Sequence, residues 1–259
     1  MFPIRDDNPQ LRPPIATYII LALNVLVWVF VQGMGTEPRL VESICNLGLI
    51  PGELMGTIAP GTQVQLGPHT YCRLGDGGWF NVLSSMFMHG GWMHIIGNMW
   101  FLWIFGGNVE DSMGPVRFTV FYLLAGIAAA AAQIVTNIAS PVPMVGASGA
   151  IGGVMGAYIL LYPRVHVHML VFLGFFVTTF AVPAVFMLGY WLVVQLVSGF
   201  ASLGAEGGGV AFWAHVGGFA TGALLVLLFK DQRLLDQHPY HGFKQPSSPT
   251  RSWHRIDRR

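Results

Sequence analysis

Three apolar stretches of this chain carry polar side chains that together could hydrolyse an ester or peptide bond. Ser148 stands where a proline-containing loop enters a glycine-rich apolar segment, His215 lies near the start of a second such segment, and His94 and Asn98 lie near the start of a third. A serine hydroxyl becomes a useful nucleophile when an adjacent base takes its proton, and histidine is the usual base. The competing interpretation of Ser148 is a helix N-cap, a position that favours serine.

The composition places these residues in a polytopic membrane protein. Of the 259 residues, 53% are hydrophobic and 10% are charged, whereas a soluble domain is about 25% charged. The mean hydropathy is +0.57. Polar side chains inside membrane segments are costly and are functional candidates by default. The histidines and the asparagine near the starts of two other apolar segments therefore favour a catalytic role over a simple helix cap for Ser148.

The apolar runs predict an all-α membrane protein with six spans. A span needs about 20 mostly apolar residues. The runs that approach this length lie at about 15–32, 91–109, 116–135, 148–162, 182–199 and 212–229. The first run could instead be a cleaved signal peptide, but it is long for one and no small-residue cleavage site follows it.

The segments outside these runs carry most of the charge. Residues 1–14 form a polar N-terminal segment, and residues 230–259 form a basic tail that we expect to be disordered. Residues 165–168 alternate apolar and histidine side chains, which indicates an extended segment at the membrane surface. A glycine-rich loop precedes the sixth span.

The distribution of Lys and Arg predicts the orientation. With six spans and a cytoplasmic amino terminus, Arg39 and Arg73 lie outside and the other 11 of the 13 Lys and Arg residues lie inside, as the positive-inside rule requires. A seven-span arrangement would move the basic tail outside and is rejected. Spans two, four and six then run from outside to inside, so His94, Ser148 and His215 share a depth in the outer third of a core about 30 Å thick.

Small residues predict how these spans pack. They recur every four positions in the fourth and sixth spans, at Gly149, Gly153 and Ala157 and at Ala214, Gly218 and Gly222. Such stripes allow close approach of membrane helices, and this contact would bring Ser148 within hydrogen-bond reach of His215. Asn98 follows His94 by four residues, so both side chains project from one helix face. They could stabilise an oxyanion together with the Ser148 backbone N–H, or simply clamp two helices.

The loop between the first two spans, residues 33–79, holds both cysteines. Cys45 and Cys72 could form a disulfide if the loop faces an oxidising compartment, or they could remain free thiols, because sequence alone does not provide the geometry. His69 near Cys72 does not make a recognisable metal-ligand spacing. We therefore expect no metal site and no cofactor.

The site residues resemble a known family. Gly146-Ala147-Ser148-Gly149, followed by Ala214-His215 and Gly218 and preceded by His89, His94 and Asn98, is similar to the motifs of the rhomboid intramembrane serine proteases. The resemblance covers essentially the whole six-span core. It implies a six-transmembrane-helix rhomboid-like bundle with a long first extramembrane loop, and a bacterial-type enzyme of the plasma membrane with both termini cytoplasmic and an outward-opening site.

The same resemblance implies the role of each site residue. Ser148 would be the nucleophile and His215 its general base, with His94 and Asn98 on the oxyanion side and His89, Gly146 and Gly149 in supporting positions. The nearest carboxylates, at residues 110–111, lie at the opposite end of the second span, so we expect a metal-independent Ser-His dyad.

This chain departs from the family pattern at two positions. Some members have a tyrosine four residues after the serine, where this chain has Gly152, and an arginine after a loop tryptophan, where it reads Trp79-Phe80. The first departure leaves open what orients His215, for which an aromatic residue from elsewhere is a candidate.

We expect the partners to be the lipid bilayer and single-span membrane proteins whose helix unwinds near small or helix-breaking residues, and we expect no nucleic acid. A catalytically inactive relative is one alternative, but it would typically lack the serine or the histidine. A transporter would need polar residues through the whole membrane thickness, and a metal site at His94 and His215 is a weaker alternative.

Overall fold

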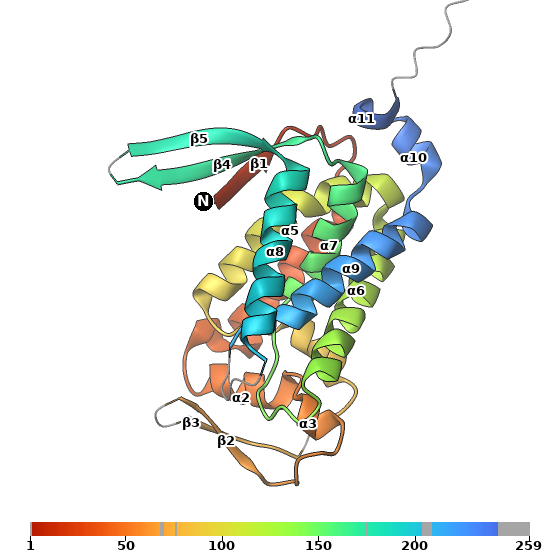
Figure 1. Ribbon diagram of the computed structural model, residues 1–259. Coiled ribbons are helices and arrows are strands. Elements are labelled where there is room, and N and C mark those ends of the chain that lie inside the picture. The colour runs from red at the N-terminus through yellow and green to blue at the C-terminus, as the bar shows by residue number, and fades with distance from the viewer. Residues whose placement is uncertain (1, 68–69, 76, 175, 204–208, 243–259) are drawn as a thin grey trace, which may run out of the picture.

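The computed structural model describes residues 2–67, 70–75, 77–174, 176–203 and 209–242, which form a helical bundle with a small sheet at each end (Figure 1). The elements in chain order are β1 Phe2–Asp6, α1 Ile15–Leu26, η1 Val27–Val31, η2 Gly33–Gly35, α2 Arg39–Leu47, α3 Pro51–Leu54, β2 Gln63–Gly67, β3 Thr70–Arg73, α4 Asn81–Ser84, η3 Ser85–Phe87, α5 Trp92–Met113, α6 Pro115–Thr136, α7 Ser148–Leu161, β4 His166–Leu173, β5 Phe176–Pro183, α8 Ala184–Ala201, α9 Phe212–Phe229, α10 Gln232–Asp236 and α11 Pro239–Gly242.

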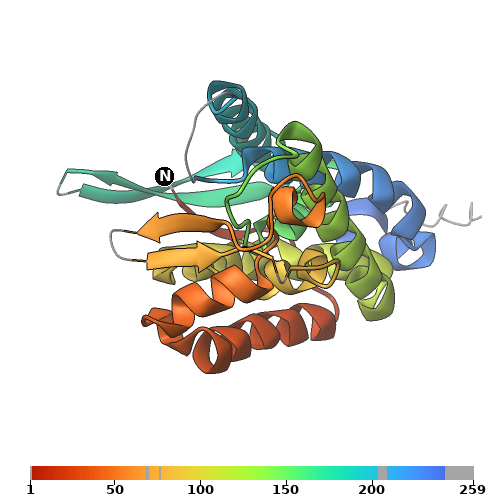
Figure 2. The ribbon, with the colours of Figure 1, turned by 90° about the horizontal axis from the view of Figure 1, so that it is seen from below.

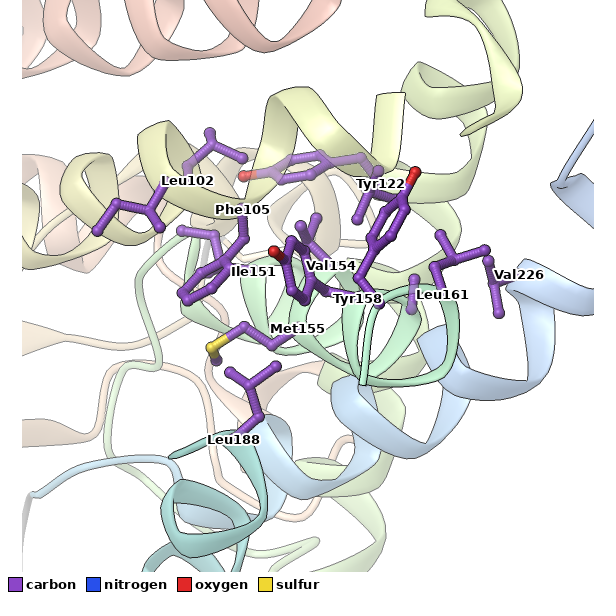
Figure 3. Packing of buried hydrophobic residues seen from close by; sticks show 14 of the residues in the cluster. Leu102, Phe105, Tyr122, Ile151, Val154, Met155, Tyr158, Leu161, Leu188 and Val226 are labelled. Atoms are coloured by element: carbon purple, nitrogen blue, oxygen red, sulfur yellow. The ribbon is translucent and has the colours of Figure 1, made fainter. Parts of the chain in front are cut away.

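Helix α7 lies at the centre of the bundle. It is buried without interruption from Gly149 to Tyr158. Side chains of the neighbouring helices surround it, as Figure 3 shows for Leu102 and Phe105 of α5, Tyr122 of α6, Leu188 of α8 and Val226 of α9. A helix that is apolar on every side has no face suited to water and is stable when covered all round.

Three of the described helices, α6, α8 and α9, are long and apolar enough to cross a bilayer. The segment 15–31 and α7 are apolar but shorter. Helix α5 is as long as α6, at 22 residues, but it carries two carboxylates near its end. Each long helix starts and ends within four residues of a predicted span, and the six-span count itself stays a prediction.

Glycines bring the backbones of α7 and α9 into contact. A β-carbon added to Gly222 would overlap the carbonyl oxygen of Gly153, and one added to Gly218 would overlap that of Gly149. Glycine is therefore the residue that permits this approach. The predicted packing of the small-residue stripes in these two helices is confirmed.

Helix α5 ends at Met113, beyond the predicted end of its span at residue 109, because Glu110 and Asp111 are buried within it instead of closing it. Glu110 accepts hydrogen bonds from the backbone N–H groups of Ala16 (2.9 Å) and Thr17 (2.8 Å). Asp111 binds backbone N–H groups just before α1. Glu110 thereby satisfies donors that lack an acceptor at the start of α1 and complements the helix dipole, whereas Asp111 holds the segment that leads into the helix.

The extended segment expected at residues 165–168 opens a β-hairpin. Strand β4 pairs antiparallel with β5, from His166 opposite Pro183 to Leu173 opposite Phe176, and β1 pairs with the other edge of β4. The hairpin reaches sideways from the bundle (Figure 2). The sequence pattern does not predict β1 or β5. The partner of β1 is distant in the chain, and β5 lies in an uninterrupted apolar run.

The loop at residues 33–79 folds at the opposite end of the bundle from this sheet (Figure 1). Cys45 of α2 and Cys72 of β3 form a disulfide, which decides between the two alternatives that the sequence leaves open. Leu49 and Met144 exchange two backbone hydrogen bonds of 2.7 and 3.0 Å. The long loop therefore braces the segment that leads into α7.

The first part of the tail is folded. Leu235 of α10 and the following His238 are buried, and the Asp231 N–H donates to the Ser112 carbonyl oxygen over 2.8 Å. The expectation of a disordered tail is wrong for residues 232–242, because an apolar side chain docks there. Three sets of residues that the sequence singles out lie outside the described residues: 243–259, His69, and Gly204, Gly207 and Gly208 of the loop before α9.

Replacing Gly222 with alanine will lower the melting temperature of the purified protein, because the new methyl group forces α9 away from α7. Overpacking of this kind costs about 1–3 kcal/mol. Gly189→Ala is the matched control, since a β-carbon there meets nothing within 4 Å and alanine favours the helix. Equal melting temperatures for the two variants would contradict the backbone contact.

Candidate active site

Ser148 is the first residue of α7, and His215 lies in the first turn of α9. The glycine contacts between these helices place their starts side by side. His215 Nε2 lies 2.7 Å from Ser148 Oγ. A hydroxyl at this distance can donate to an unprotonated imidazole nitrogen, which is the geometry that general-base activation of a serine needs.

The other edge of His215 faces α8. His215 Nδ1 lies 2.8 Å from Gln195 Oε1, and the Trp191 ring lies against the imidazole with centroids 5.8 Å apart and planes 36° apart. Trp191 in turn stacks on Phe219 of α9. An aromatic residue from elsewhere in the chain therefore contacts His215. Such a residue is the candidate named above, because this chain has Gly152 where some members of the family have a tyrosine.

Sequence reasoning missed Gln195. The available signal is a buried amide in an otherwise apolar span, four residues after Trp191 on the same helix face. It also missed Gln133 of α6, whose Oε1 accepts a hydrogen bond of 3.2 Å from the backbone N–H of Ala214. Gln133 thus satisfies one of the free N–H groups at the start of α9, beside His215.

His94 and Asn98 project from α5 toward the same place. The Gly90 N–H donates to His94 Nδ1 over 3.2 Å, so the neutral ring carries its proton on Nε2. Asn98 is buried, and its Nδ2 has no hydrogen-bond partner among the described residues. Buried amide donors are nearly always paired, so this one is suited to a ligand oxygen.

Two glycines shape the backbone around Ser148. Gly146 has φ of 128°, a conformation that other residues rarely adopt, and a β-carbon there would lie 2.7 Å from His94 Nε2. At Gly149 a β-carbon would lie 2.6 Å from that of Ala129 on α6. Both positions therefore need glycine, the first for the turn and the ring of His94, the second for helix packing.

His89 lies behind the site. It is fully buried, and its ring packs edge-on against His94 with centroids 5.2 Å apart. Its backbone N–H and carbonyl both pair with the side-chain amide of Gln32, at 2.8 Å each. His89 can therefore support His94 from behind.

A cavity of about 560 Å³ joins these groups. Its polar lining includes Ser148, His215, His94 and Asn98, and its apolar lining includes Met93, Phe101, Met155 and Trp191. Mostly apolar walls with a few convergent polar groups are typical of a ligand site. The arrangement offers a nucleophile, a base and hydrogen-bond donors around one space, which is what acyl transfer requires.

The sequence of the chain is similar to those of known proteins. Residues 76–232 match the family model described as the rhomboid domain. The chain is 30% identical over 204 residues to the rhomboid protease GluP of Bacillus subtilis, a match that covers 79% of this chain and 35% of GluP. It is 32% identical over 188 residues to RHOMBOID-like protein 4 of Arabidopsis thaliana, covering 70% of this chain and 40% of that protein. The chain thus spans well under half the length of either relative.

Ser148 will react with a fluorophosphonate probe, because His215 takes its proton as the Oγ–P bond forms and the P–F bond breaks to release fluoride. Ser148→Ala will abolish labelling, and His215→Ala will slow it roughly 100-fold or more, as loss of a general base does. Ser202→Ala, at the end of α8, is the control and will label like the native protein. In-gel fluorescence against time measures the rate, and labelling that persists in Ser148→Ala would identify a different nucleophile.

Proposed function

The chain belongs to the rhomboid family, and we propose that it is a serine-type intramembrane endopeptidase that uses a Ser148–His215 pair without a metal. The observation that carries this proposal is the 2.7 Å contact between His215 Nε2 and Ser148 Oγ at the wall of a partly open cavity. The name of one relative, a rhomboid protease, supports the same reaction class.

The first half of the reaction forms an acyl-enzyme. His215 Nε2 takes the hydroxyl proton as Ser148 Oγ attacks the scissile carbonyl carbon, and a tetrahedral oxyanion forms. The imidazolium then donates that proton to the leaving amine nitrogen, and the C–N bond breaks. In the second half, a water molecule gives its proton to His215, attacks the ester carbon and releases the carboxyl product, returning the proton to Ser148.

Three donors are arranged for the oxyanion. The Asn98 Nδ2 is buried and unpaired among the described residues, the His94 Nε2 edge lies beside Gly146, and Ser148 begins α7, where backbone N–H groups lack an acceptor within the helix. Donors of this kind stabilise charge that develops in the transition state, and they need no rearrangement as the reaction proceeds.

The length of α7 supports hydrolysis within the membrane. Its 14 residues extend about 21 Å at 1.5 Å per residue, less than a hydrocarbon core of about 30 Å. If its Leu161 end reaches the inner interface, then Ser148 lies below the outer membrane surface. The substrate peptide bond must therefore reach the serine inside the bilayer thickness.

We propose single-span membrane proteins as the substrates, because an isolated span can unwind near a small or helix-breaking residue and present extended backbone to the cavity. The charge distribution supports cytoplasmic termini and a site that opens to the outer side of a plasma membrane. The six-span topology belongs to this proposal.

The purified chain in detergent will cleave a single-span reporter protein, and Ser148→Ala and His215→Ala will each lower the rate by about 10⁴-fold or more. A chelator will leave the native rate unchanged, because the proposed chemistry uses no metal. Fragments resolved on a gel measure the cleavage. Cleavage that survives in Ser148→Ala would overturn the site assignment, and no cleavage of several reporters by the native chain would favour a binding-only relative.

Asn98→Ala will lower kcat by roughly 10²- to 10³-fold, the usual effect of losing one oxyanion donor, and will leave the melting temperature unchanged, because no described residue loses a partner. Asn137→Ala, at the end of α6, is the matched amide control and will behave like the native chain. If Asn98→Ala instead lowers the melting temperature and retains kcat, then Asn98 clamps helices.

A further inference from the structure

We propose that Gln195 of α8 is a positioning residue that holds the His215 proton on Nδ1 and so keeps Nε2 free to accept the proton of Ser148. This inference rests on the proposed function and adds a third participant to it. Gln195 does not line the cavity. In this role it acts only through its hydrogen bond to the imidazole of His215.

The two hydrogen bonds of His215 lie on opposite ring nitrogens. Nδ1 is 2.8 Å from Gln195 Oε1 and Nε2 is 2.7 Å from Ser148 Oγ. An amide oxygen only accepts hydrogen bonds, so Nδ1 must be the donor and must carry the ring proton. Neutral imidazole has one N–H, and Nε2 is consequently left with a lone pair directed at the serine hydroxyl.

The opposite tautomer would stop the reaction. With the proton on Nε2, His215 would donate to Ser148 Oγ and could not remove its hydrogen, and Nδ1 would present a lone pair to the oxygen of Gln195. Two facing lone pairs repel each other, so the amide oxygen disfavours this state. In serine proteases with a triad an aspartate enforces the same choice, and reversing the tautomer there costs kcat about 10⁴-fold.

Burial explains an amide at this position in place of a carboxylate. Gln195 is 8% exposed, in an apolar helix that is long enough to cross a bilayer. An ionised side chain at such a place is expensive, whereas an amide supplies the acceptor oxygen without a charge. The oxygen also stabilises the imidazolium that forms during the reaction, through its dipole.

Trp191 complements the hydrogen bond. Its ring lies across the imidazole at 5.8 Å between centroids, which limits tilting of His215, while Gln195 limits rotation about the ring axis. Both residues come from α8, whereas Ser148 and His215 come from α7 and α9. The position of α8 therefore sets the orientation of the base.

The test compares Gln195→Met and Gln195→Glu in the whole 259-residue chain, using reporter cleavage and fluorophosphonate labelling of Ser148. Met matches the length of Gln, but its thioether sulfur is only a weak acceptor for the Nδ1–H hydrogen bond. It will lower kcat and the labelling rate roughly 10- to 100-fold, which is part of what a general base contributes, with little change in KM. Glu keeps an acceptor oxygen, so it will retain kcat within about 10-fold. Its carboxylate favours the imidazolium, so the acid limb of the pH profile will move to higher pH.

Val193→Ala, exposed on the same helix, is the control and will retain native kcat. Native kcat in Gln195→Met, or an equal loss in the Met and Glu variants, would overturn the inference. If thermal melting shows that Gln195→Met is unfolded, then the Glu variant alone tests the inference. An acid limb of its pH profile at the native position would overturn the inference. The proposed function fails separately, when the native chain does not cleave or Ser148→Ala still does.

Discussion

The backbone contact between α7 and α9 determines whether Ser148 and His215 can meet. Each residue lies at the start of its helix, so the distance between their side chains follows from how closely the helix axes approach. Gly153 and Gly222 remove the side chains that would separate them. Helices in a bilayer gain little from burying apolar surface against one another, and close van der Waals packing of small residues takes its place.

Two kinds of polar group in the bundle have different uses. One set satisfies backbone donors at helix starts: Glu110 does so for α1, and Gln133 does so for α9. In the other set, Asn98 Nδ2 remains unpaired among the described residues. A buried donor without a partner is unfavourable for stability, and its position beside Ser148 suggests that it serves a bound group.

The long loop at residues 33–79 takes part in the same arrangement. Its Leu49 pairs with Met144, and the Gly146 N–H donates to the Ser85 carbonyl oxygen over 2.9 Å. These bonds fix the segment that enters α7 from two directions. The Cys45–Cys72 disulfide joins two parts of the loop, so a region rich in glycine and proline can still support a rigid site.

The class of the protein, the approximate helix positions and the nucleophile, base and oxyanion candidates could all be predicted from the sequence. Apolar length, small-residue spacing and polar residues in apolar runs are local properties. Contacts between residues that are distant in the chain could be seen only in the tertiary structure. Gln195 meets His215 across 20 positions of chain, β1 pairs with β4 from the far end of the sequence, and Glu110 extends α5 by binding α1. Such contacts depend on helix rotation and approach, which periodicity alone does not fix.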